Sequence, residues 1–182
     1  MAQLYFYYSA MNAGKSTSLL QSAYNYQERG MTVAIYTAAL DNRFGLGKVS
    51  SRIGLAMDAH IFNAGFNFVS HVQQLKAQGT LDCVLIDEAQ FFDAEITMVC
   101  ETLASRGIRV IVAGLDMDYL GKPFGPMPQL LAIADFISKL HAICVQCGHL
   151  ANVSYRTSEE QGTVVLGEKN NYEPRCRICA AK

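Results

Sequence analysis

The feature that most restricts how this chain can fold is a short loop containing glycine and lysine near its N-terminus. The loop, residues 9–17, reads Ser-Ala-Met-Asn-Ala-Gly-Lys-Ser-Thr and follows directly on the apolar run Leu4–Tyr8. The next segment, Ser16–Arg29, has helical periodicity and stops before Gly30, a residue typical of helix C-terminal caps. This order of strand, loop and helix is that of a phosphate-binding loop, or P-loop.

Each part of a P-loop has a task at a triphosphate. Backbone N–H groups surround the phosphates, the Lys15 ammonium meets the outer phosphate oxygens, and the Ser16 hydroxyl reaches Mg²⁺. Ser9 stands where the pattern usually has glycine, at a position that often needs an unrestricted backbone. We expect these loop residues to bind the nucleotide: Ser9, Ala10, Met11, Asn12, Ala13, Gly14, Lys15, Ser16 and Thr17.

The rest of the N-terminal part alternates between apolar runs and helical patterns. Further strands are predicted at Thr32–Thr37, Cys83–Ile86 and Ile108–Gly114, and further helices at Val69–Gln78 and Ala94–Arg106. Alternation of this kind predicts an α/β fold with a mostly parallel sheet and ligands at the carboxyl ends of its strands. A length of 182 residues suits one such domain, residues 1–142, with a small appendage.

That appendage, residues 143–182, contains four of the six cysteines in two Cys-x-x-Cys pairs. The pairs are Cys144 with Cys147 and Cys176 with Cys179. In a protein without a secretion signal this spacing indicates a closed four-cysteine site for a structural Zn²⁺. The segment between the pairs is expected to hold short strands at Asn152–Tyr155 and Thr163–Leu166, and His149 is expected to lie on the surface. Cys83 and Cys100 fall in apolar patterns and are expected in the core.

The run Val84–Ile86 ends in two acids, Asp87 and Glu88, as expected for the second half of a P-loop site. A strand end delivers both carboxylates to the edge of the sheet where the phosphates bind. Asp87 is the candidate for Mg²⁺, and Glu88 for taking a proton from an attacking hydroxyl or orienting a water. The same residues resemble the second motif of helicases, but 182 residues lack the second core and the basic strand-binding surface that a helicase needs.

Two other stretches are predicted to form loops at the site. Asp41 and Arg43 follow the second strand, where an acid and an arginine suit metal and phosphate binding. Residues 115–128 follow the last strand and have the composition of a lid that closes over a ligand. Apolar side chains that suit a planar base gather around these stretches: Met11, Phe91, Phe92, Leu115, Tyr119 and Phe124.

Charge and hydropathy exclude several functions. The formal net charge is −1, so nucleic acid is not expected as a partner. The longest uninterrupted apolar stretch, Val110–Leu115, is far too short to span a membrane, and the chain enters a strand without a basic leader. We therefore expect a cytoplasmic protein with no membrane contact.

Taken together, the motifs resemble those of the thymidine kinases shared by bacteria and the animal cytosol. The matching stretches are SAMNAGKST, YTAALDNRF, VLIDEAQFF, VIVAGLDMDYLGKPFGPMPQL and CVQC with CRIC, in this order over nearly the whole chain. The resemblance implies a RecA-like P-loop domain with a zinc-anchored lasso, usually assembled as a homotetramer. It also implies transfer of the γ-phosphate of ATP, with Mg²⁺, to the 5′-hydroxyl of thymidine or deoxyuridine.

The resemblance also implies roles for individual residues. Glu88 corresponds to the family's general base, while Asp41, Arg43 and Asp87 join the P-loop on the ATP side. The residues that correspond to the nucleoside pocket are Met11, Phe91, Leu115, Phe124, Val165, Gly167 and Tyr172. Two alternatives stay open at this point: a zinc-ribbon P-loop ATPase that acts on nucleic acid, and a kinase of another small acceptor.

Overall fold

The structure is a computed structural model that describes residues 3–39, 47–63, 66–157 and 171–181. Its centre is a six-stranded sheet with strands β1 Leu4–Tyr8, β2 Val33–Ala38, β5 His60–Phe62, β6 Cys83–Ile86, β7 Arg109–Gly114 and β8 Phe136–Lys139. The strand order is β5-β2-β6-β7-β1-β8, and every neighbouring pair is parallel. The predicted α/β class with a mostly parallel sheet is confirmed.

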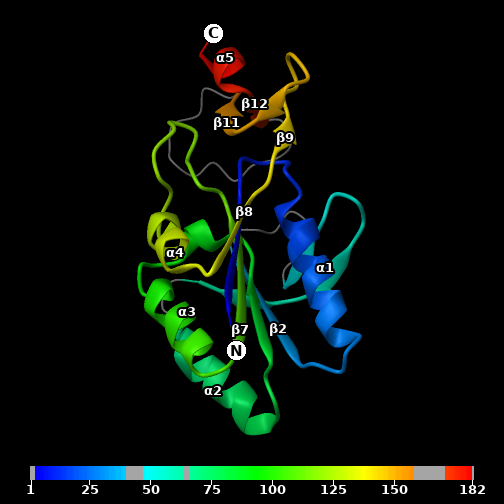
Figure 1. The fold of residues 1–182 in the computed structure, drawn as a ribbon, viewed down its shortest axis with the longest axis vertical. Helices are drawn as coiled ribbons and strands as arrows, with labels where there is room; N and C mark the ends of the chain where they lie inside the picture. The colour runs from blue at the N-terminus through cyan, green and yellow to red at the C-terminus, as the bar shows by residue number, and fades with distance from the viewer. Residues whose placement is uncertain (1–2, 40–46, 64–65, 158–170, 182) are drawn as a thin grey trace.

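Helices cover both faces of this sheet (Figure 1). Helix α1 Lys15–Gln27 lies on one face, and helices α2 Phe68–Gln78, α3 Ile96–Ser105 and α4 Met127–Ile133 lie on the other. The central strand β6 shows why its sequence is apolar throughout: Val84 and Ile86 face α2 to α4, whereas Cys83 and Leu85 face α1. Strands buried on both faces read as continuous apolar runs rather than as alternating ones.

The predicted boundaries fall within one or two residues of the observed ones for β1, β2, β6, β7 and the first three helices. Sequence patterns missed β5 and β8, the two edge strands. Strand β5 has three residues, and all four residues of β8 are exposed, so neither carries the apolar run by which the inner strands were found. Helix α4 and the hairpin of β3 Lys48–Ser50 and β4 Ala56–Asp58 were missed as well.

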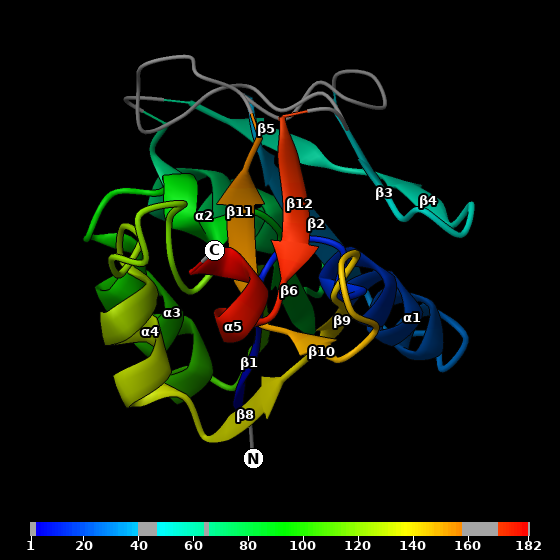
Figure 2. The same cartoon turned by 90° about the horizontal axis from the view of Figure 1, so that it is seen from above.

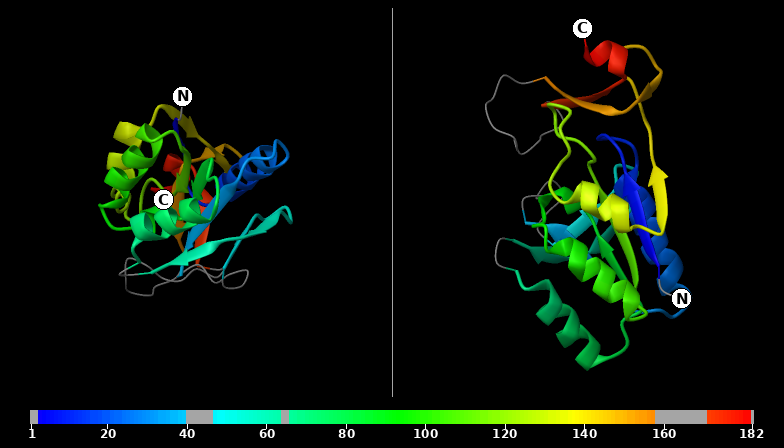
Figure 3. Two further views of the ribbon diagram at one scale, coloured as in Figure 1. Left: turned by 90° about the horizontal axis from the view of Figure 1, so that it is seen from below. Right: turned by 60° about the vertical axis from the view of Figure 1, so that its left-hand side comes forward.

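The C-terminal segment forms a small separate layer beyond the carboxyl ends of the strands (Figures 1 and 3). It contains two antiparallel pairs, β9 Ala142–Ile143 with β10 Leu150–Ala151 and β11 Val153–Arg156 with β12 Tyr172–Arg175, and ends in the short helix α5 Arg177–Ala180. Seen from above, β11, β12 and α5 lie over the sheet (Figure 2). The predicted strand at Asn152–Tyr155 corresponds to β11, and Thr163–Leu166 lies outside the described residues. The domain division at residue 143 stays a prediction.

Candidate active site

The P-loop lies between the end of β1 and the start of α1, at the carboxyl edge of the sheet. Asn12 and Gly14 adopt left-handed conformations, with φ of 64° and 80°, which turn the chain into the helix. Ser9 is fully buried and is not among the described non-glycine residues with positive φ. Its replacement of the usual glycine therefore needs no strained backbone here.

Lys15 is nearly buried, and its ammonium lies inside the loop. Its Nζ donates to the carbonyl oxygen of Ala10 at 2.7 Å. A buried ammonium is costly unless it is paired, so this carbonyl partly replaces the lost water. The loop thus holds a cation at the place where a triphosphate would meet it.

Asp87 follows β6 and is directed to the same place. Its carboxylate accepts from the Glu88 N–H at 3.0 Å, and the Ser16 hydroxyl is near enough to lower its pKa. Burial, followed by repulsion from the Glu88 carboxylate, raises the pKa of Asp87 to about 7, against the opposing effects of these hydrogen bonds and of Lys15. A buried carboxylate beside a hydroxyl, with its charge only partly compensated, suits a divalent cation with oxygen ligands.

Glu88 has a left-handed backbone, with φ of 54°, and precedes the 3₁₀ turn η1 Ala89–Phe91. Glu88 and Asn12 are the two non-glycine residues in the described part of the chain with positive φ, and both lie at this site. Such conformations cost energy and are concentrated at functional sites. The turn directs the Glu88 carboxylate to the Gln90 amide, which donates to its Oε2 at 2.6 Å.

Gln90 is a buried site residue that sequence reasoning missed. Its amide nitrogen holds Glu88, while its Oε1 accepts from the Leu115 N–H at 3.0 Å. Gly125 of the lid stretch packs so closely on Gln90 that a Cβ there would lie 2.3 Å from the Gln90 carbonyl oxygen. The sequence signal that could have identified Gln90 is its position two residues after Glu88. Gln90 therefore links the acid pair to the loop after β7.

The two phenylalanines that follow the acid pair, Phe91 and Phe92, have different aromatic partners. Phe91 contacts Phe124 edge to face, with ring centroids 5.7 Å apart, as expected for two residues of one pocket. Phe92, its neighbour, packs instead among Phe62 and Phe68 in the core. Phe91 and Phe92 both pack against this core cluster, so only the contact with Phe124 sets Phe91 apart.

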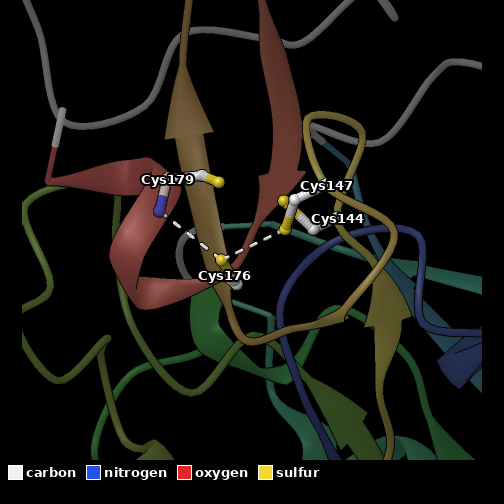
Figure 4. A group of neighbouring side chains, drawn as sticks. All are labelled: Cys144, Cys147, Cys176 and Cys179. Atoms are coloured by element: carbon white, nitrogen blue, oxygen red, sulfur yellow. Dashed lines mark hydrogen bonds between the residues drawn. The ribbon is translucent and has the colours of Figure 1, made fainter.

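The four cysteines of the C-terminal layer meet, as predicted. Their Sγ atoms all lie within 4.8 Å of one another, two from the loop after β9 and two from the start of α5 (Figure 4). The Cys179 backbone N–H lies 3.4 Å from the Cys176 Sγ and lowers the pKa of that thiol, which favours the thiolate that binds metal. Four converging sulfurs with no open position suit a structural zinc. His149 is exposed, with Nδ1 3.4 Å from the Cys147 Sγ.

Contacts from this layer reach down to the site. Met11 of the P-loop donates its N–H to the Ser154 Oγ of β11 at 3.0 Å. The Arg156 guanidinium lies 3.5 Å from the ring centroid of Tyr119 in the lid stretch and donates from Nε to the Tyr172 hydroxyl at 3.1 Å. Neither Ser154 nor Arg156 was singled out from the sequence, since neither belongs to a motif.

Four of the predicted site residues lie outside the described residues: Asp41, Arg43, Val165 and Gly167.

Cys83 and Cys100 are fully buried, as expected. None of the helices in the described ranges is long and apolar enough to cross a membrane.

A parallel α/β sheet with a P-loop after β1, and with an acid pair after β6 at the same edge of the sheet, defines the chain as a P-loop nucleotide-binding protein. A family model described as thymidine kinase matches residues 2–180. The chain belongs to the thymidine kinase family.

Individual relatives agree with this assignment. The thymidine kinase of Vibrio parahaemolyticus is 48% identical over 184 residues, covering 97% of this chain and 95% of that protein. That of Aliivibrio fischeri is 49% identical over 170 residues, covering 93% and 88%. Among solved structures, a DNA replication initiation factor aligns at 16% identity with a TM-score of 0.44, covering 77% of this chain and 40% of that one. So distant a likeness carries no functional information.

Proposed function

We propose that this chain transfers the γ-phosphate of ATP to the 5′-hydroxyl of thymidine or deoxyuridine. The family assignment supports the reaction, and one structural observation supports its location. The Asp87 carboxylate, which follows β6, lies near Ser16 and Lys15 of the P-loop. This proximity supports the proposal that the P-loop and the acid pair belong to one site.

On the donor side, residues 9–17 bind the triphosphate, with the Lys15 ammonium at the outer phosphates. Ser16 and Asp87, whose side chains lie near each other, are the residues that would hold Mg²⁺. The ion supplies neutralisation of phosphate charge when it is bound. Asp41 and Arg43 complete this side in the proposal.

Glu88 accepts the proton of the nucleoside 5′-hydroxyl. Phosphoryl transfer passes through a loose transition state, so alignment of the base matters more than its basicity. The positive φ of Glu88 and its hydrogen bond from Gln90 restrict where the carboxylate points. Gln90 is a positioning residue in this scheme, because it acts through Glu88.

The nucleoside base lies between the P-loop and the C-terminal layer, among Met11, Phe91, Leu115, Phe124 and Tyr172. Backbone groups near Val165 and Gly167 contact its edge. The contact of Phe91 with Phe124, and the bond from Arg156 to Tyr172, support a pocket with walls from both parts. A structural Zn²⁺ on the four cysteines would hold the layer in place and so lower the ordering cost of binding. The homotetramer and the cytoplasmic location expected from the resemblance remain part of this proposal.

One assay tests the proposal against its alternatives. ADP release from ATP is followed with thymidine, deoxyuridine, deoxycytidine, single-stranded DNA or no acceptor. The proposal predicts strong turnover with thymidine or deoxyuridine and little without acceptor. Turnover with deoxycytidine alone would indicate another small acceptor, and hydrolysis stimulated by DNA without nucleoside would indicate a nucleic-acid ATPase. Either result would contradict the proposal.

A further inference from the structure

The peptide unit between Ala10 and Met11 is held from both sides by groups that are far apart in the chain. Its carbonyl oxygen accepts from the Lys15 Nζ at 2.7 Å, and its N–H donates to the Ser154 Oγ at 3.0 Å. Ala10, Lys15 and Ser154 are all buried. The carbonyl of this peptide is therefore bound by a residue of the P-loop, and its N–H by a residue of the C-terminal layer.

Ser154 is itself well fixed. It lies in β11, paired with Pro174 of β12, and β12 leads directly into the cysteines at the start of α5. A second contact joins the same two parts: Ala13 of the P-loop packs against Ala142, Ala151 and the cysteine cluster. The P-loop thus contacts the C-terminal layer at two points, at Met11 through a hydrogen bond and at Ala13 through packing.

The two hydrogen bonds on the peptide depend differently on ATP. When the Lys15 ammonium turns toward phosphate oxygens, its bond to the Ala10 carbonyl weakens. The bond from the Met11 N–H to Ser154 is expected to persist, because neither group is needed to bind phosphate in this scheme. Since leaving a partly buried N–H without an acceptor costs free energy, the Ser154 hydroxyl would then oppose rotation of this peptide.

We propose that Ser154 is a positioning residue for the donor site. Its hydroxyl fixes the Ala10–Met11 peptide and keeps the P-loop in the form that receives the triphosphate, so the cysteine layer supports ATP binding as well as the nucleoside pocket. This inference rests on the proposed function for the identity of the donor, but not on the identity of the acceptor.

The sharpest test compares Ser154→Thr with Ser154→Val. The two side chains have nearly the same shape, and both suit a strand, but only threonine keeps the hydroxyl. Ser51→Ala is the matched control, because Ser51 is also a buried serine whose Oγ accepts a backbone N–H, that of Leu55, in the β3–β4 hairpin. Circular dichroism and melting temperature establish that each variant is folded.

The first readout is direct binding of ATP without nucleoside, followed by KM for ATP, KM for thymidine and kcat. Ser154→Val is expected to weaken ATP binding by up to roughly tenfold, the effect of leaving one partly buried donor without its acceptor. KM for ATP rises in parallel, while Ser154→Thr and Ser51→Ala stay within about threefold of the wild type.

Equal ATP affinity in the Thr and Val variants would overturn the proposal, as would a similar loss in Ser51→Ala. A Val variant that only melts at lower temperature, with unchanged ATP affinity, would reduce Ser154 to a structural role and so contradict it. If the wild type binds ATP but does not phosphorylate thymidine, the proposed function fails while the binding comparison still decides the role of Ser154.

Discussion

Replacing Asp87 with asparagine is expected to stabilise the nucleotide-free protein and, at the same time, to remove the carboxylate proposed to hold Mg²⁺. The carboxylate is buried and lies beside Glu88, which raises its pKa from 3.8 to about 7. Between these two pH values the folded chain binds a proton that the unfolded chain has released. The wild type therefore loses stability as pH rises from about 4 to about 7, and the loss persists above pH 7.

The size of the effect follows from the same two values. A rise from 3.8 to about 7 corresponds to at most about 4 kcal/mol at pH 8, and to less than about 2 kcal/mol at pH 5. Asparagine is neutral throughout and keeps an oxygen that accepts the Glu88 N–H. The stability advantage of Asp87→Asn should therefore grow by roughly 2 to 3 kcal/mol between pH 5 and pH 8.

Urea unfolding at the two pH values, without nucleotide or Mg²⁺, measures this difference. Asp58→Asn, which changes an exposed carboxylate on β4, is the control and should show little pH-dependent gain. Turnover of Asp87→Asn with ATP and Mg²⁺ should fall sharply. An advantage that is equal at pH 5 and pH 8, or that is larger at pH 5, would refute the reasoning about this buried charge.

Two other substitutions test separate parts of the account. Gly125→Ala should destabilise the protein by about 1 to 3 kcal/mol in urea unfolding, since the new Cβ would lie 2.3 Å from the Gln90 carbonyl oxygen and Gly125 has φ of 51°. Gly121→Ala is the control: Gly121 also has positive φ, but a Cβ there would meet open space, so the loss of stability should be smaller. Cys176→Ser should lower the zinc content, measured by atomic absorption, and weaken thymidine binding. The control Cys100→Ser should keep the metal. Full zinc content in Cys176→Ser would argue against the four-cysteine site.

Elements were predicted correctly from the sequence where the burial of the element in the fold also determines its local pattern of apolar residues. Strand β6 was found to the residue because both of its faces are buried, which makes the whole run Cys83–Ile86 apolar. The edge strand β8 has no such pattern, because all four of its residues are exposed. Metal ligands were likewise readable, since two short spacings bring the thiols together.

The contacts that join distant segments were not readable. Ser154 has no motif, and its role depends on a hydrogen bond to Met11 across more than 140 positions. Phe91 and Phe92 look alike in sequence and both pack against the core cluster, yet Phe91 contacts Phe124 whereas Phe92 contacts Phe62 and Phe68. The backbone conformation decides which neighbours a side chain contacts, and short sequence patterns do not reveal it. Glu88 is an example, because its positive φ is unusual for a residue other than glycine.

The central claim is that Glu88 serves as the base in transfer from ATP to a nucleoside hydroxyl. It is tested most directly by following the γ-phosphate of labelled ATP into thymidine, with wild type and Glu88→Gln compared at equal nucleoside occupancy. We expect labelled thymidine monophosphate from the wild type and a severe loss of transfer in Glu88→Gln, with thymidine binding largely kept. Unchanged transfer in the variant, or label released only as inorganic phosphate by the wild type, would contradict it.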